Sequence, residues 1–170
     1  GPGWPNPPWS TAHIRMVLEN PTFRSRFIST MQIALNSAFA PTRLNQLIDT
    51  YVNKIAAEVP FHKQRWGGNI NDWNFEVNRL RNYANLRSNF MHSHLQSFFG
   101  LSNNLQVQTS LSNGEGKINL NQVKVKNQTM QVSQGTQITA KALPDPGFAF
   151  KEWQITTSNS TPVPLIAAND

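Results

Sequence analysis

The chain has 170 residues, of which 38% are hydrophobic and 14% are charged, and its net charge is +6. Ten Phe and five Trp supply enough large apolar side chains for a packed core, which excludes a disordered chain. The lack of cysteine excludes disulfides, Cys-ligated zinc and thiol nucleophiles. Basic residues are scattered rather than clustered, so nucleic-acid binding is not expected. No window approaches the ~20 apolar residues of a membrane span.

The N-terminal region predicts a leader followed by two helices. Residues 1–9 hold four prolines and are expected to be irregular. Ser10 or Thr11 would cap a short helix that ends near Asn20. A second helix is predicted over residues 21–39. Its apolar stripe would consist of Phe23, Phe27, Ile28, Met31 and Leu35.

A third helix is predicted from Pro41 to about Val59, with Pro60 as the residue that stops it. This helix has the clearest amphipathic pattern in the chain. The pattern comprises Leu44, Leu47, Ile48, Tyr51, Val52, Ile55 and Ala56. Residues 62–68 then predict a connector that contains Trp66.

The last helical stretch is expected to begin with Asn71 or Asp72 as its cap and to end at Gly100. The pattern leaves open whether it is one helix or two, broken near Arg87-Ser88. The buried face of its first part would consist of Trp73, Val77, Leu80 and Ala84, and its second part carries Phe90, Met91, Leu95 and Phe98.

Beyond Gly100 the apolar period changes from about 3.6 to 2, which predicts roughly four to six short antiparallel strands. Asn113-Gly114-Glu115-Gly116 is a strong turn signal. The final strand would carry Phe148 and Phe150 on one face of the sheet. Residues 158–170 are rich in Ser, Thr, Pro and Asn and predict a linker or a disordered tail. The predicted fold class is therefore α+β: an antiparallel helical bundle followed by a small antiparallel β module.

The order and spacing of several phrases in the first hundred residues carry a family resemblance. The phrases are Leu18 to Arg24, Arg26 to Ile28, Leu35 to Pro41, Leu47 to Asp49, His62 to Trp66, Trp73 to Arg87 and Leu95 to Leu101. Together they resemble the C-terminal helices of CotH-family domains, the secreted kinase-like domains known from spore coats. The resemblance divides the chain into a leader (1–9), a CotH-like helical segment (10–101), a β module (102–157) and a tail (158–170).

A second resemblance lies in the β part. Its signature is Gly135 to Ala142, then Pro144, Gly147-Phe148, Phe150 and Trp153. This signature is similar to a β-repeat of exported bacterial proteins, related in style to internalin B-repeats. Both resemblances imply a bacterial protein that is secreted or held at the cell surface.

CotH-family domains use ATP and Mg²⁺ to phosphorylate proteins, but the resemblance places their nucleotide- and metal-binding residues upstream of the part matched here. No catalytic, cofactor-binding or metal-binding residue is therefore assigned, and no cofactor is expected on this chain. We expect a non-catalytic structural and interaction segment whose partner is the upstream part of the same polypeptide. Apolar helix faces left exposed would also permit a homodimer.

Two alternatives remain open. The first is a carbohydrate- or cell-surface-binding module, with a cell-surface protein or polysaccharide as partner. Its stacking platform would be built from Trp66, Trp153, Phe148 and Phe150, although a core role for these side chains is favoured. The second is residual ATP-dependent kinase function, which needs an acidic metal cluster. The sequence holds neither a Gly-x-Gly-x-x-Gly loop nor a Walker loop.

Several polar residues suggest weaker hypotheses. Asp72 and Glu76 lie one helical turn apart and could share a cation, but a capping and dipole role is preferred. His92 and His94 are two apart and would point to different faces of a helix, which disfavours a zinc site. Three arginines are candidates for a basic contact, with a solvated basic face as the favoured interpretation. They are Arg79, Arg81 and Arg87.

Overall fold

A computed structural model describes residues 11–102, 104–155 and 165–167. The predicted leader therefore lies outside the described residues. The described helices are α1 (Ala12–Glu19), α2 (Pro21–Asn36), α3 (Pro41–Ile55), α4 (Val59–Trp66) and α5 (Ile70–Phe99). The described strands are β1 (Asn104–Thr109), β2 (Gly116–Leu120), β3 (Val123–Val125), β4 (Gln128–Ser133), β5 (Ile138–Pro144) and β6 (Leu165–Ala167). Helices followed by small sheets confirm the α+β class.

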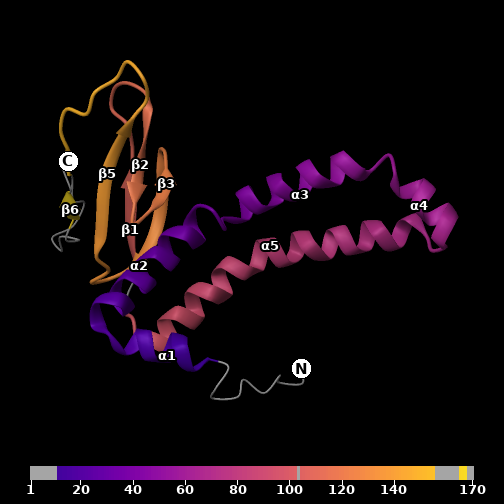
Figure 1. Ribbon diagram of the computed structural model, residues 1–170, viewed down its shortest axis with the longest axis horizontal. Helices are drawn as coiled ribbons and strands as arrows, with labels where there is room; N and C mark the ends of the chain where they lie inside the picture. The colour runs from indigo at the N-terminus through magenta and orange to yellow at the C-terminus, as the bar shows by residue number, and fades with distance from the viewer. Residues whose placement is uncertain (1–10, 103, 156–164, 168–170) are drawn as a thin grey trace.

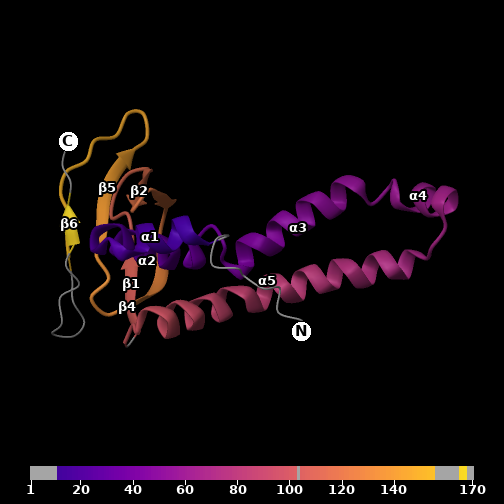
Figure 2. The ribbon, with the colours of Figure 1, turned by 60° about the horizontal axis from the view of Figure 1, so that its bottom comes forward.

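The molecule is elongated, with the β module at one end and a helical hairpin that extends to the other end (Figure 1). Figures 1 and 2 both show α3 and α5 side by side as a long hairpin, with α4 at its far end. At the near end, α2 runs along the β module. The hairpin thus projects away from the sheets, and only its base adjoins the rest of the protein.

Two helix boundaries differ from the prediction, because Pro60 starts a helix instead of stopping one. α3 ends at Ile55, and Pro60 occupies the first turn of α4, where its missing N–H costs nothing. Most of the predicted connector over 62–68 is therefore helix. The break comes at Gly67 and Gly68, whose φ angles of +82° and +96° no helix can contain.

α5 is one continuous helix of 30 residues. Its N-cap is Asn69 rather than Asn71 or Asp72; Asp72 sits three residues further on and closes a capping box. The break considered near Arg87-Ser88 does not occur. Ser88 is buried there and donates its hydroxyl to the carbonyl of Leu35 at 3.0 Å, which joins α5 to α2.

The strands form two sheets. β1 pairs only with β4, and the other sheet has the order β3-β2-β5-β6. Most pairs are antiparallel, as predicted, but β5 and β6 are parallel. Gly116 lets β2 approach β5 closely, since a Cβ at this position would lie 2.7 Å from the carbonyl oxygen of Leu143.

The C-terminal part of the prediction needs two corrections. Residues 148–155 form no strand, so Phe148 and Phe150 do not share a sheet face. β5 is already paired with β2 on one side and with β6 on the other. β6 itself lies within 158–170, which had been predicted as a linker or tail; the other residues of that segment lie outside the described ranges.

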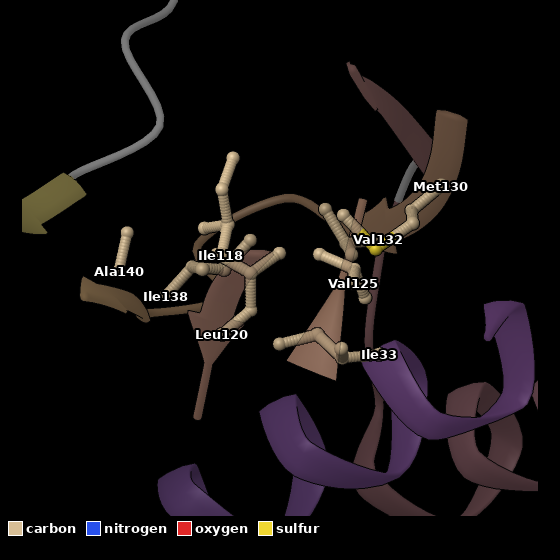
Figure 3. Close-up of a cluster of buried hydrophobic side chains, with 8 residues drawn as sticks. All are labelled: Ile33, Ile118, Leu120, Val125, Met130, Val132, Ile138 and Ala140. Atoms are coloured by element: carbon tan, nitrogen blue, oxygen red, sulfur yellow. The ribbon is translucent and has the colours of Figure 1, made fainter. Parts of the chain in front are cut away.

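The core of the β module includes a residue from α2. Ile33 is 0% exposed and packs with side chains from β2, β3, β4 and β5 (Figure 3). Those partners are Ile118, Leu120, Val125, Met130, Val132, Ile138 and Ala140. The predicted stripe of α2 is therefore only partly right: Leu35 is buried, Phe23 is exposed, and the side chains that reach the β module include Gln32, Ile33 and Asn36.

Two amide side chains of α2 bond to the β module. Gln32 donates from Nε2 to the Ser133 hydroxyl at 2.8 Å, and its Oε1 accepts from Ser133 N–H (3.2 Å) and the Thr136 hydroxyl (2.9 Å). Asn36 bonds both backbone groups of Gln131 in β4, donating at 2.8 Å and accepting at 3.0 Å. Asn36 thus occupies backbone groups that β4 does not share with β1.

Candidate functional site

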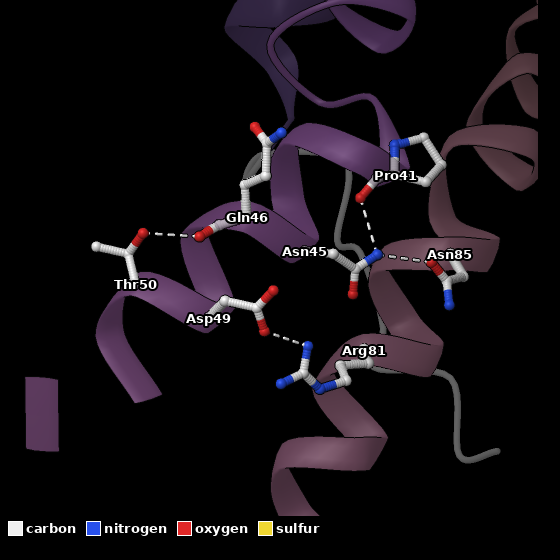
Figure 4. Close-up of polar contacts among 7 residues, drawn as sticks. All are labelled: Pro41, Asn45, Gln46, Asp49, Thr50, Arg81 and Asn85. Carbon is white, nitrogen blue, oxygen red and sulfur yellow. Dashed lines mark hydrogen bonds and ion pairs between the residues drawn. The ribbon is translucent and has the colours of Figure 1, made fainter. Parts of the chain in front are cut away.

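Side-chain polar contacts connect α3 and α5 within the hairpin. Asn45 donates to Asn85 at 2.7 Å, and Arg81 donates to Asp49 at 2.5 Å (Figure 4). Both pairs are at least partly solvent-exposed, so each contributes little to stability. Most of the α3 stripe is only half-buried, and Tyr51 and Ile55 are exposed.

α5 carries apolar side chains on two opposite faces. One face holds buried Ala84, Ser88 and Leu95. The other holds four large apolar residues that are between 46% and 63% exposed: Phe75, Tyr83, Leu86 and Phe90. At 100° per residue these four fall within an arc of about 80°, roughly opposite the buried face. We call them the α5 stripe.

Sequence reasoning missed the α5 stripe. The apolar pattern names Phe90 without assigning it to a face, and it proposes none of the four residues as an exposed surface. The signal was present, because spacings of eight, three and four residues repeat the helical period. A helix that is apolar on opposite faces is typical of one covered on both sides. The stripe is therefore the strongest candidate interaction surface on the hairpin.

The predicted basic contact is divided among different partners. Arg79 pairs with Glu76 on its own helix at 2.9 Å, Arg81 bonds to Asp49 of α3, and Arg87 lies 5.7 Å from the ring centre of Tyr83. Arg81 thus joins the two arms of the hairpin, while the other two arginines make contacts within α5.

The predicted stacking platform is not one surface. Trp66 ends α4 at the far end of the hairpin and is 69% exposed, with the Arg65 guanidinium 5.1 Å from its ring centre. The ring centres of Phe150 and Trp153 lie 5.2 Å apart, and Trp153 also packs on the core of the β module. The ring of Phe148 covers Gly114, where a Cβ would lie 2.9 Å from it.

The acidic pair has structural partners. Asp72 accepts from the backbone N–H of Asn69 at 2.9 Å, as its preferred capping role requires. Glu76 is engaged by Arg79. Within the described ranges, no group of three or more His, Asp or Glu side chains could hold a metal ion. No described helix is long and apolar enough to cross a membrane.

His92 lies half-buried where α5 meets α2. Burial lowers the pKa of its imidazole below the ordinary value of 6.5. Asn36 places its Nδ2 3.3 Å from His92 Nε2. The two hydrogens of this Nδ2 are donated to the carbonyl oxygens of Gln32 at 2.7 Å and Gln131 at 2.8 Å, so burial rather than this amide disfavours the charged imidazole.

We expect the free energy of unfolding to decrease as the pH falls from above 6.5 through the folded-state pKa of His92. In that range the unfolded chain binds a proton that the folded chain does not. Urea unfolding at about pH 7.5 and about pH 5.5 measures the effect, which His92→Gln should reduce. His94→Gln, at an exposed position on the same helix, is the control. Equal pH dependence in both variants would contradict this assignment.

The fold and the α5 stripe define the chain as an α+β protein with a partly covered helical part joined to a small β module. Its sequence matches the family model described as CotH kinase protein over residues 1–91. It also matches the model described as divergent InlB B-repeat domain over residues 108–167. The first match spans more than half of the chain, so the chain belongs to the CotH family. No curated protein and no solved structure matches significantly.

Proposed function

We propose that this chain is a non-catalytic structural and interaction segment of a secreted, surface-associated CotH-like protein. Its helices would complete a kinase-like domain, with the nucleotide and metal site on the upstream part of the same polypeptide. The β module would serve as a spacer or attachment unit. The observation that carries this proposal is the α5 stripe, an apolar face at helical spacing on the side of α5 opposite its buried face.

The energetic argument is that the stripe favours a covered state. Full burial of a large apolar side chain contributes roughly 1.5–3 kcal/mol, and the stripe has four such residues. Tyr83 and the neighbouring Arg87 also offer hydrogen-bond donors at its border. An upstream lobe of the same polypeptide is the occupant that the CotH match favours, since residues 1–91 belong to that family.

The test compares a triple variant, Phe75→Ser, Tyr83→Ser and Phe90→Ser, in two polypeptides. In the present chain it should leave the urea midpoint nearly unchanged and reduce the binding of an apolar dye. In a longer CotH-family polypeptide that includes an upstream lobe, it should lower stability by several kcal/mol, about 1–2 for each side chain that loses its burial.

The matched control is a triple variant at exposed apolar positions outside the stripe: Ile14→Ser, Met16→Ser and Phe61→Ser. It should affect the two polypeptides alike. Equal effects of the stripe variant on both polypeptides would contradict docking on an upstream lobe. Self-association of the present chain that the stripe variant abolishes, with no extra effect in the longer polypeptide, would instead establish a homodimer.

A further inference from the structure

The strand β1 has an open edge: among the described residues, no strand pairs with its outer side. It pairs only with β4, so its sheet has two strands. An open edge of this kind can accept another extended segment through backbone hydrogen bonds. The edge belongs to the β module, whereas the α5 stripe belongs to the hairpin, so the inference below does not depend on the function proposed above.

The contacts of α2 show which backbone groups of β1 face this open edge. Asn36 bonds both the N–H and the C=O of Gln131, on the side of β4 away from β1. In an antiparallel ladder both backbone groups of a residue point the same way, so Gln131 and its partner Gln106 form a non-hydrogen-bonded pair. The N–H and C=O of Gln106 therefore point outward. Because the ladder alternates, those of Asn104 and Gln108 point outward as well.

The edge of β1 lacks the features that protect the other described edges. β1 has six residues, none of them charged and none of them proline. β3 and β6, at the edges of the other sheet, have three residues each, and β3 carries Lys124. The outer side of β4 is occupied by Gln32 and Asn36 of α2. Short strands, lysine and proline are devices against edge-to-edge pairing, so β1 is the described edge best suited to accept a strand.

Both faces of β1 match a second copy of the same strand. Gln106 and Gln108 are exposed, while Leu105 and Val107 are half-buried and pack against the core of the β module. Antiparallel pairing of two copies centred on Gln106 places Gln106 opposite Gln106, and Leu105 opposite Val107. Asn104 then lies opposite Gln108, and the outward backbone groups of both bond across the two copies. No like charges meet in this register, because β1 carries none.

We propose that this chain forms a homodimer in which β1 of one copy pairs antiparallel with β1 of the other, centred on Gln106. The two small sheets then become one sheet in the order β4-β1-β1-β4. A two-stranded sheet is marginal by itself and gains stability from further strands. A second copy is favoured over an unrelated strand because the twofold register pairs apolar with apolar and amide with amide side chains, as an isologous interface requires.

Sedimentation equilibrium of the full chain over a range of concentrations, combined with amide exchange, tests the proposal. We expect reversible self-association. The outward N–H groups of Asn104, Gln106 and Gln108 should exchange freely in the monomer and become protected as the dimer forms. Their exchange should slow roughly tenfold when about nine-tenths of the chain is dimeric, since it would then proceed through the remaining monomer.

Charges placed at the centre of the interface give a sharper test. Gln106→Lys and Gln106→Glu each bring like charges directly opposite one another, and each should weaken association about fivefold. An equimolar mixture of the two variants should associate at least as tightly as the unmodified chain, because opposite charges then face each other. Gln131→Lys is the matched control, since it is exposed on β4 beside Gln106. Its two copies would lie three strand spacings apart, about 14 Å, which exceeds the Debye length at physiological salt.

Gln106→Pro provides an independent variant. The N–H of Gln106 makes no bond to β4, so proline removes the central bonds between the two copies and leaves the β1–β4 ladder intact. It should abolish the association. Circular dichroism establishes that each variant is folded, and the charge variants keep the test decisive should the proline variant fail to fold.

Four results would overturn the proposal. They are a monomeric unmodified chain at all concentrations, association without added protection of the outward amides, equal effects of Gln106→Lys and Gln131→Lys, and a mixture of charge variants that associates no better than either alone. The triple variant of the α5 stripe should associate as the unmodified chain does. Association that the stripe variant abolishes and that Gln106→Lys leaves unchanged would belong to the α5 stripe, and it would overturn the β1 interface.

Discussion

Ile33→Ala is expected to lower the free energy of unfolding by about 2–5 kcal/mol, although Ile33 belongs to a helix and most of its partners to strands. Ile33 is 0% exposed and reaches from α2 into the core cluster of the β module (Figure 3). Alanine would leave a cavity among side chains from β2, β3, β4 and β5. Urea unfolding measures the loss, and amide exchange in the strands should accelerate with it.

Ile55→Ala provides the matched control for this variant. Ile55 lies in α3 and is 50% exposed. Its replacement by alanine removes the same atoms without leaving a cavity in a core. Its cost should be about 1 kcal/mol or less. Two results would contradict the proposal that α2 and the strands share one core. One is a loss of stability in Ile33→Ala no larger than that in Ile55→Ala, and the other is unchanged amide exchange in the strands.

Gln32→Leu is expected to lower the free energy of unfolding by about 3 kcal/mol, because the side-chain amide of Gln32 takes part in three buried hydrogen bonds that leucine cannot make. The backbone N–H of Ser133 and the hydroxyls of Ser133 and Thr136 would each lose a partner. Buried polar groups without partners cost about 1–3 kcal/mol each, and leucine offers none. The same urea experiment measures this cost.

Gln46→Leu is the control, because Gln46 lies at an exposed position of α3. It should change stability by less than about 0.5 kcal/mol. Adding Thr136→Val to Gln32→Leu should recover part of the loss, since that removes one unpaired hydroxyl. If the stability losses of Gln32→Leu and Thr136→Val simply added in the double variant, the hydroxyl of Thr136 would not be paired with Gln32.

Both predictions concern how the two family-matched parts are joined. The CotH match ends at residue 91 and the repeat match begins at 108, yet Gln32, Ile33 and Asn36 of α2 pack into or bond to the β module. The boundary predicted between 101 and 102 is therefore a boundary of sequence resemblance that the packing crosses. The β module is attached to α2 by a shared core rather than only by the connecting residues.

Sequence by itself determined the family and several local features of the fold. Asn20-Pro21 predicts the start of α2, and Asn20 accepts from Phe23 N–H at 3.1 Å as a cap should. Gly100 ends α5 with a φ of +61°, and the change of apolar period beyond it predicts the strands. These features depend on a few neighbouring residues whose conformational preferences do not require the rest of the fold.

Only the tertiary structure decided which apolar faces are covered. Helical spacing places Phe90 and Leu95 on opposite apolar faces of α5, and it does not indicate which face is covered. In the structure Leu95 is buried and Phe90 is exposed. Likewise, nothing local marks Gln32 as buried, because its partners Ser133 and Thr136 lie about a hundred residues away. Periodicity shows that a face is apolar, whereas burial depends on which distant element packs against it.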